Sequence, residues 1–246
     1  MKINVQVLDF DIGKVLSYDT EEDIDLITIG DFSCTRRNLL SIDEDMLKKL
    51  KNLRKRLLLQ LPLVVKEDEL AWMKKFSMRM YDHFDGFITG DLGLVRFLGN
   101  LGDKEIVYTT NITNRAFSRL LERDFKVTRV RPLMYKRTFI KENIGFPKDV
   151  VVYGNLMINC ATFCFHSEDD LVENCRFGCK EPRKLMMNEE ELHLVGRSLI
   201  TENRFDITGK IGDIGDMDTA TIMDLDLDIQ EIHESIGKIK KYVRVG

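Results

Sequence analysis

Residues 86–110 read GFITGDLGLVRFLGNLGDKEIVYTT and contain one complete strand–helix–strand unit. The run Gly86–Gly90 predicts a short strand, and Glu105–Thr110 predicts a second one, rich in β-branched and aromatic residues. Between them, Leu92–Leu101 repeats apolar residues at helical spacing after Asp91, a residue type that often caps a helix. Strands joined by a helix in this way are typical of a parallel sheet.

The same alternation extends along most of the chain. We expect further strands at Ile3–Leu8, Leu26–Ile29, Leu57–Leu61, Lys126–Val130, Val150–Tyr153 and Thr219–Leu225. We expect helices at Ile42–Arg56, with Ser41 as its N-cap, and at Glu67–His83, Arg115–Arg123 and Ile229–Lys241.

Length and strand count together predict the fold. The chain has 246 residues, and an eight-stranded α/β barrel takes roughly 250. We therefore predict an α/β fold, a single TIM-like (β/α)8 barrel that forms one domain over residues 1–246. Residues 155–182 would form an elaborated, cysteine-rich loop after the seventh strand. Beyond it, Leu192–Ile207 alternates like an antiparallel excursion.

Composition restricts the class of protein. Apolar residues make up 43% of the chain and charged residues 32%, which predicts a substantial core. The net charge of −4 gives no support for a general nucleic-acid or membrane surface. No apolar run approaches the roughly 20 residues of a membrane span, and the first residues do not resemble a signal peptide. We expect a cytoplasmic protein whose five cysteines are reduced.

Four of those cysteines lie within residues 155–179, at positions 160, 164, 175 and 179. Cys175 and Cys179 are four positions apart, so one helical turn would direct both thiols to the same side. Clustered thiolates repel one another unless a soft cation binds between them, which predicts zinc or an iron–sulfur cluster. A zinc ion could use these four cysteines alone. The simpler alternative is that each is a small buried apolar residue.

The fifth cysteine, Cys34, follows the predicted strand Leu26–Ile29. The carboxyl ends of all barrel strands meet at one face of the barrel, where active sites of this fold lie. Cys34 and Cys164 would therefore share that face, although 130 positions separate them. This placement would allow Cys34 to join the later cysteines.

Polar residues near other strand ends are candidates for substrate binding. Arg129 and Arg131 alternate on one strand and point the same way; if that way is inward, they require an anion, and a substrate carboxylate would fit. Asn111 follows a strand and could either contact a substrate or cap the next helix. Asp31 and Asp91 also end strands; Asp31 could contact a substrate and both could act as acid or base, while helix capping explains Asp91 equally well. The sequence contains no Gly-rich phosphate loop, Gly-x-Ser-x-Gly elbow or His-Glu-x-x-His pair.

Several of these motifs also resemble those of a known family. Residues 29–37, IGDFSCTRR, resemble a strand-end motif in which a cysteine after a Gly-acidic pair is a cluster ligand. Residues 153–156, YGNL, with Cys164, Cys175 and Cys179, resemble the same family's tyrosine–glycine strand and later cysteines. Asp91-Leu92-Gly93, Asn111 with Asn114, and Pro132 fall in register with further family positions. The family is the collagenase-like peptidase family, peptidase family U32, and the likeness is greatest to its UbiU and UbiV iron–sulfur proteins.

The resemblance implies a barrel that carries a 4Fe-4S cluster on Cys34, Cys164, Cys175 and Cys179. It also implies a part in oxygen-independent hydroxylation of a small aromatic or related substrate, as UbiU and UbiV act together in ubiquinone synthesis, either alone or as one subunit of a heterodimer with a related family member. Two alternatives stay open: a peptidase, and a non-catalytic subunit whose metal (zinc or an iron–sulfur cluster) only holds a loop in place. The chain departs from the family in a shorter loop between Cys164 and Cys175, in the additional Cys160, and beyond residue 180.

Overall fold

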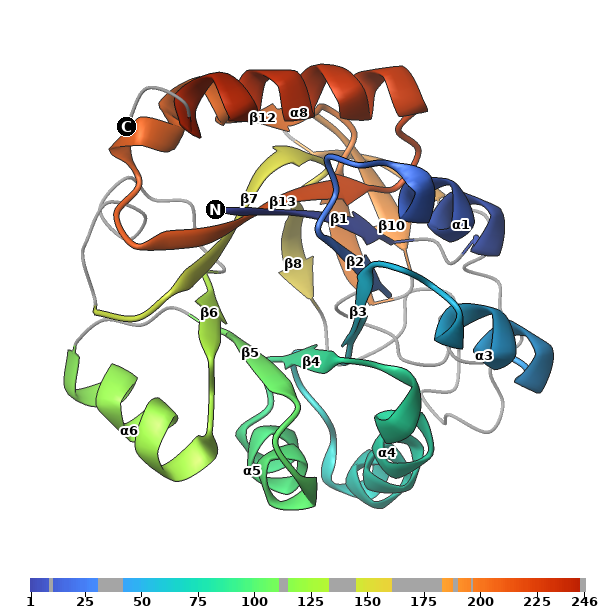
Figure 1. Cartoon of the computed structure of the whole chain (residues 1–246), viewed down its shortest axis with the longest axis vertical. Helices are drawn as coiled ribbons and strands as arrows, with labels where there is room; N and C mark the ends of the chain where they lie inside the picture. Colours follow the sequence, from blue (N-terminus) through green and yellow to red (C-terminus); the bar gives the residue numbers. More distant parts are fainter. Residues whose placement is uncertain are drawn as a thin grey trace.

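A closed parallel barrel forms the body of the molecule (Figure 1). The computed structural model describes residues 1–8, 11–30, 42–110, 115–132, 145–160, 183–187, 190–195 and 197–243. The barrel strands are β1 (Lys2–Val7), β2 (Leu26–Ile29), β3 (Arg56–Gln60), β4 (Gly86–Thr89), β5 (Glu105–Thr109), β6 (Arg129–Arg131), β7 (Lys148–Gly154) and β13 (Met217–Asp224). Each pairs in parallel with the next in this order, and β13 pairs with β1 to close the ring. The predicted TIM-like (β/α)8 barrel is confirmed.

Helices surround the barrel because alternate residues of its strands point outward and are apolar. They are α1 (Ile12–Thr20), α3 (Glu44–Lys51), α4 (Glu67–Met80), α5 (Leu92–Leu101), α6 (Arg115–Phe125) and α8 (Ile229–Val243), with a short 3-10 turn η1 (Tyr81–His83) after α4. Val5, Phe87 and Ile106 point outward from three strands and are buried in one core with the helices. Figure 1 shows the helices on the outside of the ring.

Two helix starts test the capping predictions. The Asp91 carboxylate accepts a hydrogen bond from the Leu94 amide at 2.9 Å, so the predicted cap of α5 is confirmed. The predicted Ser41 cap is wrong. Asp43 caps α3 instead, because its carboxylate accepts from the Met46 amide at 2.8 Å and leaves Glu44 as the first helical residue.

Strand β6 begins later than its sequence predicts. Lys126 adopts a positive φ of 53°, a left-handed conformation that turns the chain out of α6 and interrupts an extended run. The strand therefore starts at Arg129 and not at Lys126. This strand is only three residues long, which limits its pairing with β7.

Strands β6 and β7 share fewer paired residues than any other neighbouring strands of the barrel. Only Val130 and Lys148 are partners in the ladder. At the other end of β7, the two-residue strand β12 (Phe205–Asp206) pairs antiparallel with Tyr153 and Gly154 on the edge that β6 leaves free. The barrel mouth is therefore bordered by β12 at this position.

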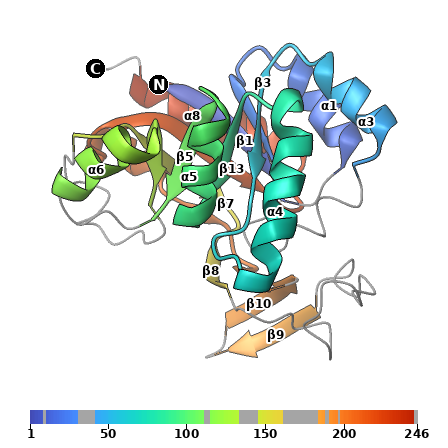
Figure 2. The ribbon, with the colours of Figure 1, turned by 90° about the horizontal axis from the view of Figure 1, so that it is seen from below.

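A second, antiparallel sheet covers part of the mouth. It contains β8 (Met157–Cys160), β11 (Ser198–Thr201), β10 (Glu190–Val195) and β9 (Arg183–Met187), in that spatial order, so the predicted antiparallel excursion is present. Ile200 of this sheet belongs to one buried apolar cluster with Leu8 and Leu63, which follow the carboxyl ends of β1 and β3. Figure 2 shows the sheet beyond one end of the barrel. The single domain over residues 1–246 stays a prediction.

Helix length also bears on membrane insertion. Among the described residues, no helix is both long enough and apolar enough to cross a membrane.

Candidate functional site at the carboxyl-terminal mouth

Polar side chains fill much of the barrel interior, beside a small apolar cluster of Leu58, Ile88 and Val107. Strand β1 reads KINVQV: Ile3, Val5 and Val7 pack outward against the helices, and the alternation directs Asn4 and Gln6 inward. The inward polar side chains Asn4, Gln6, Thr28, Arg131, Asp149 and Thr221 are all fully or almost fully buried. They form a single hydrogen-bonded network across the barrel.

The centre of this network is an ion pair. Arg131 Nη2 lies 2.8 Å from Asp149 Oδ2, and neither side chain is more than 1% exposed. The Thr221 hydroxyl donates to the other Asp149 oxygen, and Arg131 Nη1 donates to Gln6 Oε1. A buried ion pair needs such additional hydrogen bonds to offset the loss of its hydration.

The network ends at the backbone of Gly30, where β2 leaves the barrel. Gln6 Nε2 donates to the Gly30 carbonyl oxygen at 2.8 Å, and the Gly30 amide donates to the Val7 carbonyl at 3.0 Å. Gly30 has φ of 111°, a conformation that favours glycine. The next residues, 31–41, contain Asp31 and Cys34 and lie outside the described part of the chain.

A second glycine ends the strand that leads to the other cysteines. Gly154 at the end of β7 has φ of 110°, and a Cβ at this position would overlap the Met223 carbonyl group. Asn155 then fixes the turn, because Nδ2 donates to the Thr201 carbonyl at 2.8 Å and Oδ1 accepts from Arg204 Nη1 at 2.7 Å. The chain continues from there into β8, which ends at Cys160.

Most of the predicted site residues fall outside the described ranges. These residues are Cys34, Cys164, Cys175 and Cys179, the proposed cluster ligands, with Asp31 and Asn111. In the part of the chain that the structure does describe, no group of three or more His, Cys, Asp or Glu side chains could hold a metal ion. The structure does describe the backbone of two residues that precede the cysteine-containing segments, Gly30 and Gly154. Gly30 and Gly154 both lie at the carboxyl ends of parallel strands, and hence at one face of the barrel.

Arg129 and Arg131 both point into the barrel, and carboxylates of the chain itself meet them. Arg129 is 3% exposed; it forms an ion pair with Glu105 and lies 3.5 Å from Asp218. Arg131 pairs with Asp149. The anion that inward guanidinium groups require is thus supplied internally. Substrate binding by these arginines stays a prediction, and an anionic substrate would have to compete with these carboxylates.

A solved protein has the same arrangement of strands and helices. "The Structure of the U32 Peptidase Mk0906" matches 92% of this chain and 94% of that chain, with a TM-score of 0.53 and 13% sequence identity. The chain shares the fold of a U32 peptidase. No protein-family model matches the chain, and no curated protein matches it. The resemblance to the U32 family is therefore confirmed at the level of the fold, and this likeness extends to the fold alone.

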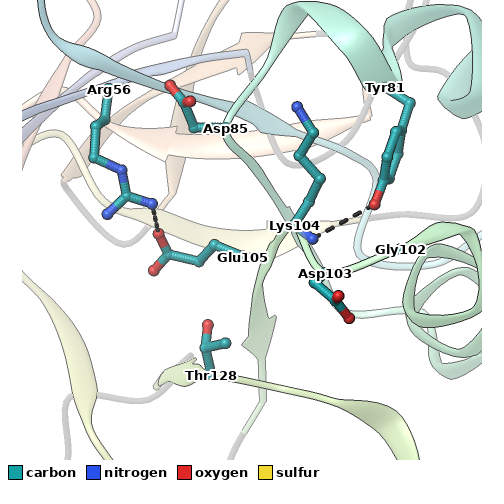
Figure 3. A pocket seen from close by; sticks show the side chains of 8 residues that line it. All are labelled: Arg56, Tyr81, Asp85, Gly102, Asp103, Lys104, Glu105 and Thr128. Carbon is teal, nitrogen blue, oxygen red and sulfur yellow. Dashed lines mark hydrogen bonds and ion pairs between the residues drawn. The ribbon is translucent and has the colours of Figure 1, made fainter.

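A hollow of about 630 Å³ lies at the opposite end of the barrel, at the amino-terminal ends of β3 to β6 (Figure 3). Its lining residues are Arg56, Tyr81, Asp85, Gly102, Asp103, Lys104, Glu105 and Thr128. Their polar groups pair with the protein itself: Arg56 contacts Glu105 at 2.7 Å, Lys104 Nζ donates to the Phe84 carbonyl at 2.7 Å, and Asp85 accepts from the Leu57 amide at 2.8 Å. We interpret this end as stabilising, since barrel active sites lie at the carboxyl-terminal face.

The network residues Gln6 and Asp149 were not among the predicted site residues. The signal for Gln6 is the strict polar alternation of β1. Asp149 lies in β7, which begins at Lys148, two residues before the predicted Val150. No local pattern indicates that it meets Arg131, because that contact forms only when β6 and β7 lie side by side.

Proposed function

We propose that this chain is an iron–sulfur protein of the UbiU/UbiV type that takes part in oxygen-independent hydroxylation of a small aromatic or related substrate. Cys34, Cys164, Cys175 and Cys179 would hold a 4Fe-4S cluster. The supporting observation is that β2 and β7, the strands that precede these cysteines, end at the same face of the barrel. Gly30 directly follows β2 and Gly154 ends β7, and the two glycines have nearly equal positive φ.

The donor set suits such a cluster, because cysteine thiolates are its usual ligands. When bound, the cluster would supply one-electron transfer. The residues of the chain would bind and orient the substrate at the mouth, above the buried Arg131–Asp149 pair. We further propose that the protein acts alone or as one subunit of a pair with a related family member, and in the cytoplasm.

Zinc is the alternative metal, and the two sites differ by one cysteine. A zinc site would use Cys160 with Cys164, Cys175 and Cys179, whereas the cluster would use Cys34 in place of Cys160. Cys160 is the last residue of β8, and its backbone pairs with Ser198 in the second sheet.

Two variants purified without oxygen distinguish these sites. The iron–sulfur proposal predicts about four iron atoms and four sulfides per wild-type chain. It also predicts that C34S loses the iron while C160S keeps it. Zinc in the wild type, lost in C160S and retained in C34S, would assign the zinc site instead. Protein that binds neither metal in this experiment would contradict both assignments.

A peptidase is the second candidate, because the structural neighbour is described as a U32 peptidase. In the described residues, His193 of β10 pairs with Glu202 and lies opposite Ile200, whose side chain packs at the barrel mouth. A histidine oriented by a carboxylate is a common general base. The test is cleavage of casein by the wild type and its loss in H193Q; an inactive wild type removes this candidate.

A further inference from the structure

We propose that Gln60 and Thr109 bind the substrate at the barrel mouth, where the Gln60 carboxamide oxygen accepts a hydrogen bond from a hydroxyl or amino group of that substrate. This inference rests on the proposed function, because it concerns the small molecule that would be hydroxylated. Gln60 is the last residue of β3, and Thr109 is the last residue of β5. Both therefore lie at the carboxyl-terminal end of the barrel, where active sites of this fold lie.

The two side chains point into the barrel. Leu59 belongs to the core that the strands share with the helices, so the alternation of β3 directs Gln60 to the inner side. Tyr108 belongs to the same outer core, so the alternation of β5 directs Thr109 inward as well. Gln60 is fully buried, and Thr109 is 2% exposed.

The hydrogen bonds of Gln60 determine the orientation of its carboxamide. Nε2 lies 2.6 Å from the Leu61 carbonyl oxygen and 3.2 Å from the Ile88 carbonyl oxygen. Carbonyl oxygens only accept hydrogen bonds, so the amide nitrogen must face them, and Oε1 is the end left for another partner. Oε1 is buried, and no residue in the described ranges donates a hydrogen bond to it. Gln60 therefore offers a buried acceptor.

Thr109 adds a second polar group of this kind. Its Oγ1 is also buried and has no hydrogen-bond partner within the described part of the chain. Leu58 and Val107, the preceding inward residues of β3 and β5, form one apolar cluster with Ile88 of β4. In the ladders, Ile88 pairs with both Gln60 and Val107. Gln60 and Thr109 thus lie on the mouth side of an apolar layer, and a molecule that enters from the mouth meets them first.

The unpaired acceptor limits the chemical class of the ligand. A buried acceptor without a partner is unfavourable, and a ligand hydroxyl or amino group removes this cost by donating a hydrogen bond to it. An ether has no donor and a carboxylate only accepts, so neither group can bind Gln60 Oε1. The Thr109 hydroxyl can both donate and accept, and it can serve the same ligand. Phenol is the simplest aromatic molecule that meets this requirement.

The first experiment compares phenol with anisole, its methyl ether, on metal-free protein. The two probes share a ring, but only phenol donates a hydrogen bond. Titrations followed by NMR of isotope-labelled protein give their dissociation constants. We expect the wild type to bind phenol at least about tenfold more tightly than anisole, and Q60M to lose this preference. Absence of phenol binding, or an unchanged preference in Q60M, would overturn the inference and assign water as the partner of Oε1.

Thr109 gives a second variant with a matched control, in case Q60M does not fold. T109V removes only the unpaired hydroxyl. T89V makes the same change at the end of β4, where the Thr89 hydroxyl donates to the Pro62 carbonyl at 2.8 Å. We expect T109V to bind phenol several-fold more weakly than the wild type at no loss of thermal stability, and T89V to lose stability but keep the wild-type affinity. Equal phenol affinities of the two variants would overturn the assignment of Thr109 to the site.

These measurements are independent of the metal. Protein that binds phenol with the expected preference but contains no iron after anaerobic purification would refute the proposed cluster and leave the Gln60 site in place. Iron-containing protein that does not distinguish phenol from anisole would refute the Gln60 site alone.

Discussion

Arg131 and Asp149 form a fully buried ion pair between β6 and β7, with Nη2 and Oδ2 2.8 Å apart. These two strands share only one ladder pair, Val130 with Lys148. The ion pair lies one residue beyond that pair on each strand. The Arg131–Asp149 side chains therefore hold β6 and β7 together at the point where backbone hydrogen bonding between the two strands ends.

Removing one member of this pair should be strongly destabilising. Arg131→Met leaves the Asp149 carboxylate buried without its cation, and we expect a loss of about 3–5 kcal/mol in the free energy of unfolding. The double variant R131M/D149L removes both charges and should recover most of that loss. Urea denaturation measures both values. A double variant no more stable than R131M would show that the charges do not act as a pair.

The glycine at the end of β7 should be more sensitive than another left-handed glycine. Gly154 has φ of 110° and an added Cβ would overlap the Met223 carbonyl, whereas Gly145, with φ of 66°, has open space around it. Gly145→Ala should cost about 1–2 kcal/mol from backbone conformation alone. Gly154→Ala should cost more, since the clash adds to the strain. Thermal melts of the two variants compare them, and an equal loss would contradict the packing argument.

The outward half of each strand could be predicted from sequence, because apolar periodicity is local. The strand Leu26–Ile29 and the helix Leu92–Leu101, with its Asp91 cap, have the predicted bounds. The inward network could not be predicted, since Gln6 and Arg131 are 125 residues apart and meet only in the closed barrel. The predicted start of β6 at Lys126 was wrong, because the left-handed turn at Lys126 has no Gly or Asn that would indicate it in the sequence. The metal ligands stay predictions, since Cys34, Cys164, Cys175 and Cys179 lie outside the described residues.

Stability should fall in strong base because of Tyr18. Burial and, next, the nearby Asp224 carboxylate raise the pKa of this phenol well above its usual range. The folded protein therefore favours the neutral phenol, and this contribution is present below about pH 10, the ordinary tyrosine pKa, and is lost as the pH rises beyond it. Tyr18→Phe should show a smaller fall in unfolding free energy between about pH 9 and 11 than the wild type. Parallel curves for the two proteins would contradict the assignment.

Removing the hydroxyl group of Thr109 should make the protein more stable. Its side chain is 2% exposed, and none of the residues that the structure describes forms a hydrogen bond with its Oγ1. Valine has nearly the same shape, so T109V removes an unsatisfied buried group and should raise the free energy of unfolding by about 1 kcal/mol. Thr89 is the matched control, because its hydroxyl donates to the Pro62 carbonyl at 2.8 Å, and T89V should lower stability by about 1 kcal/mol. Opposite signs in urea denaturation are the expected result; a loss in both variants would show that solvent or a ligand satisfies Thr109 in solution.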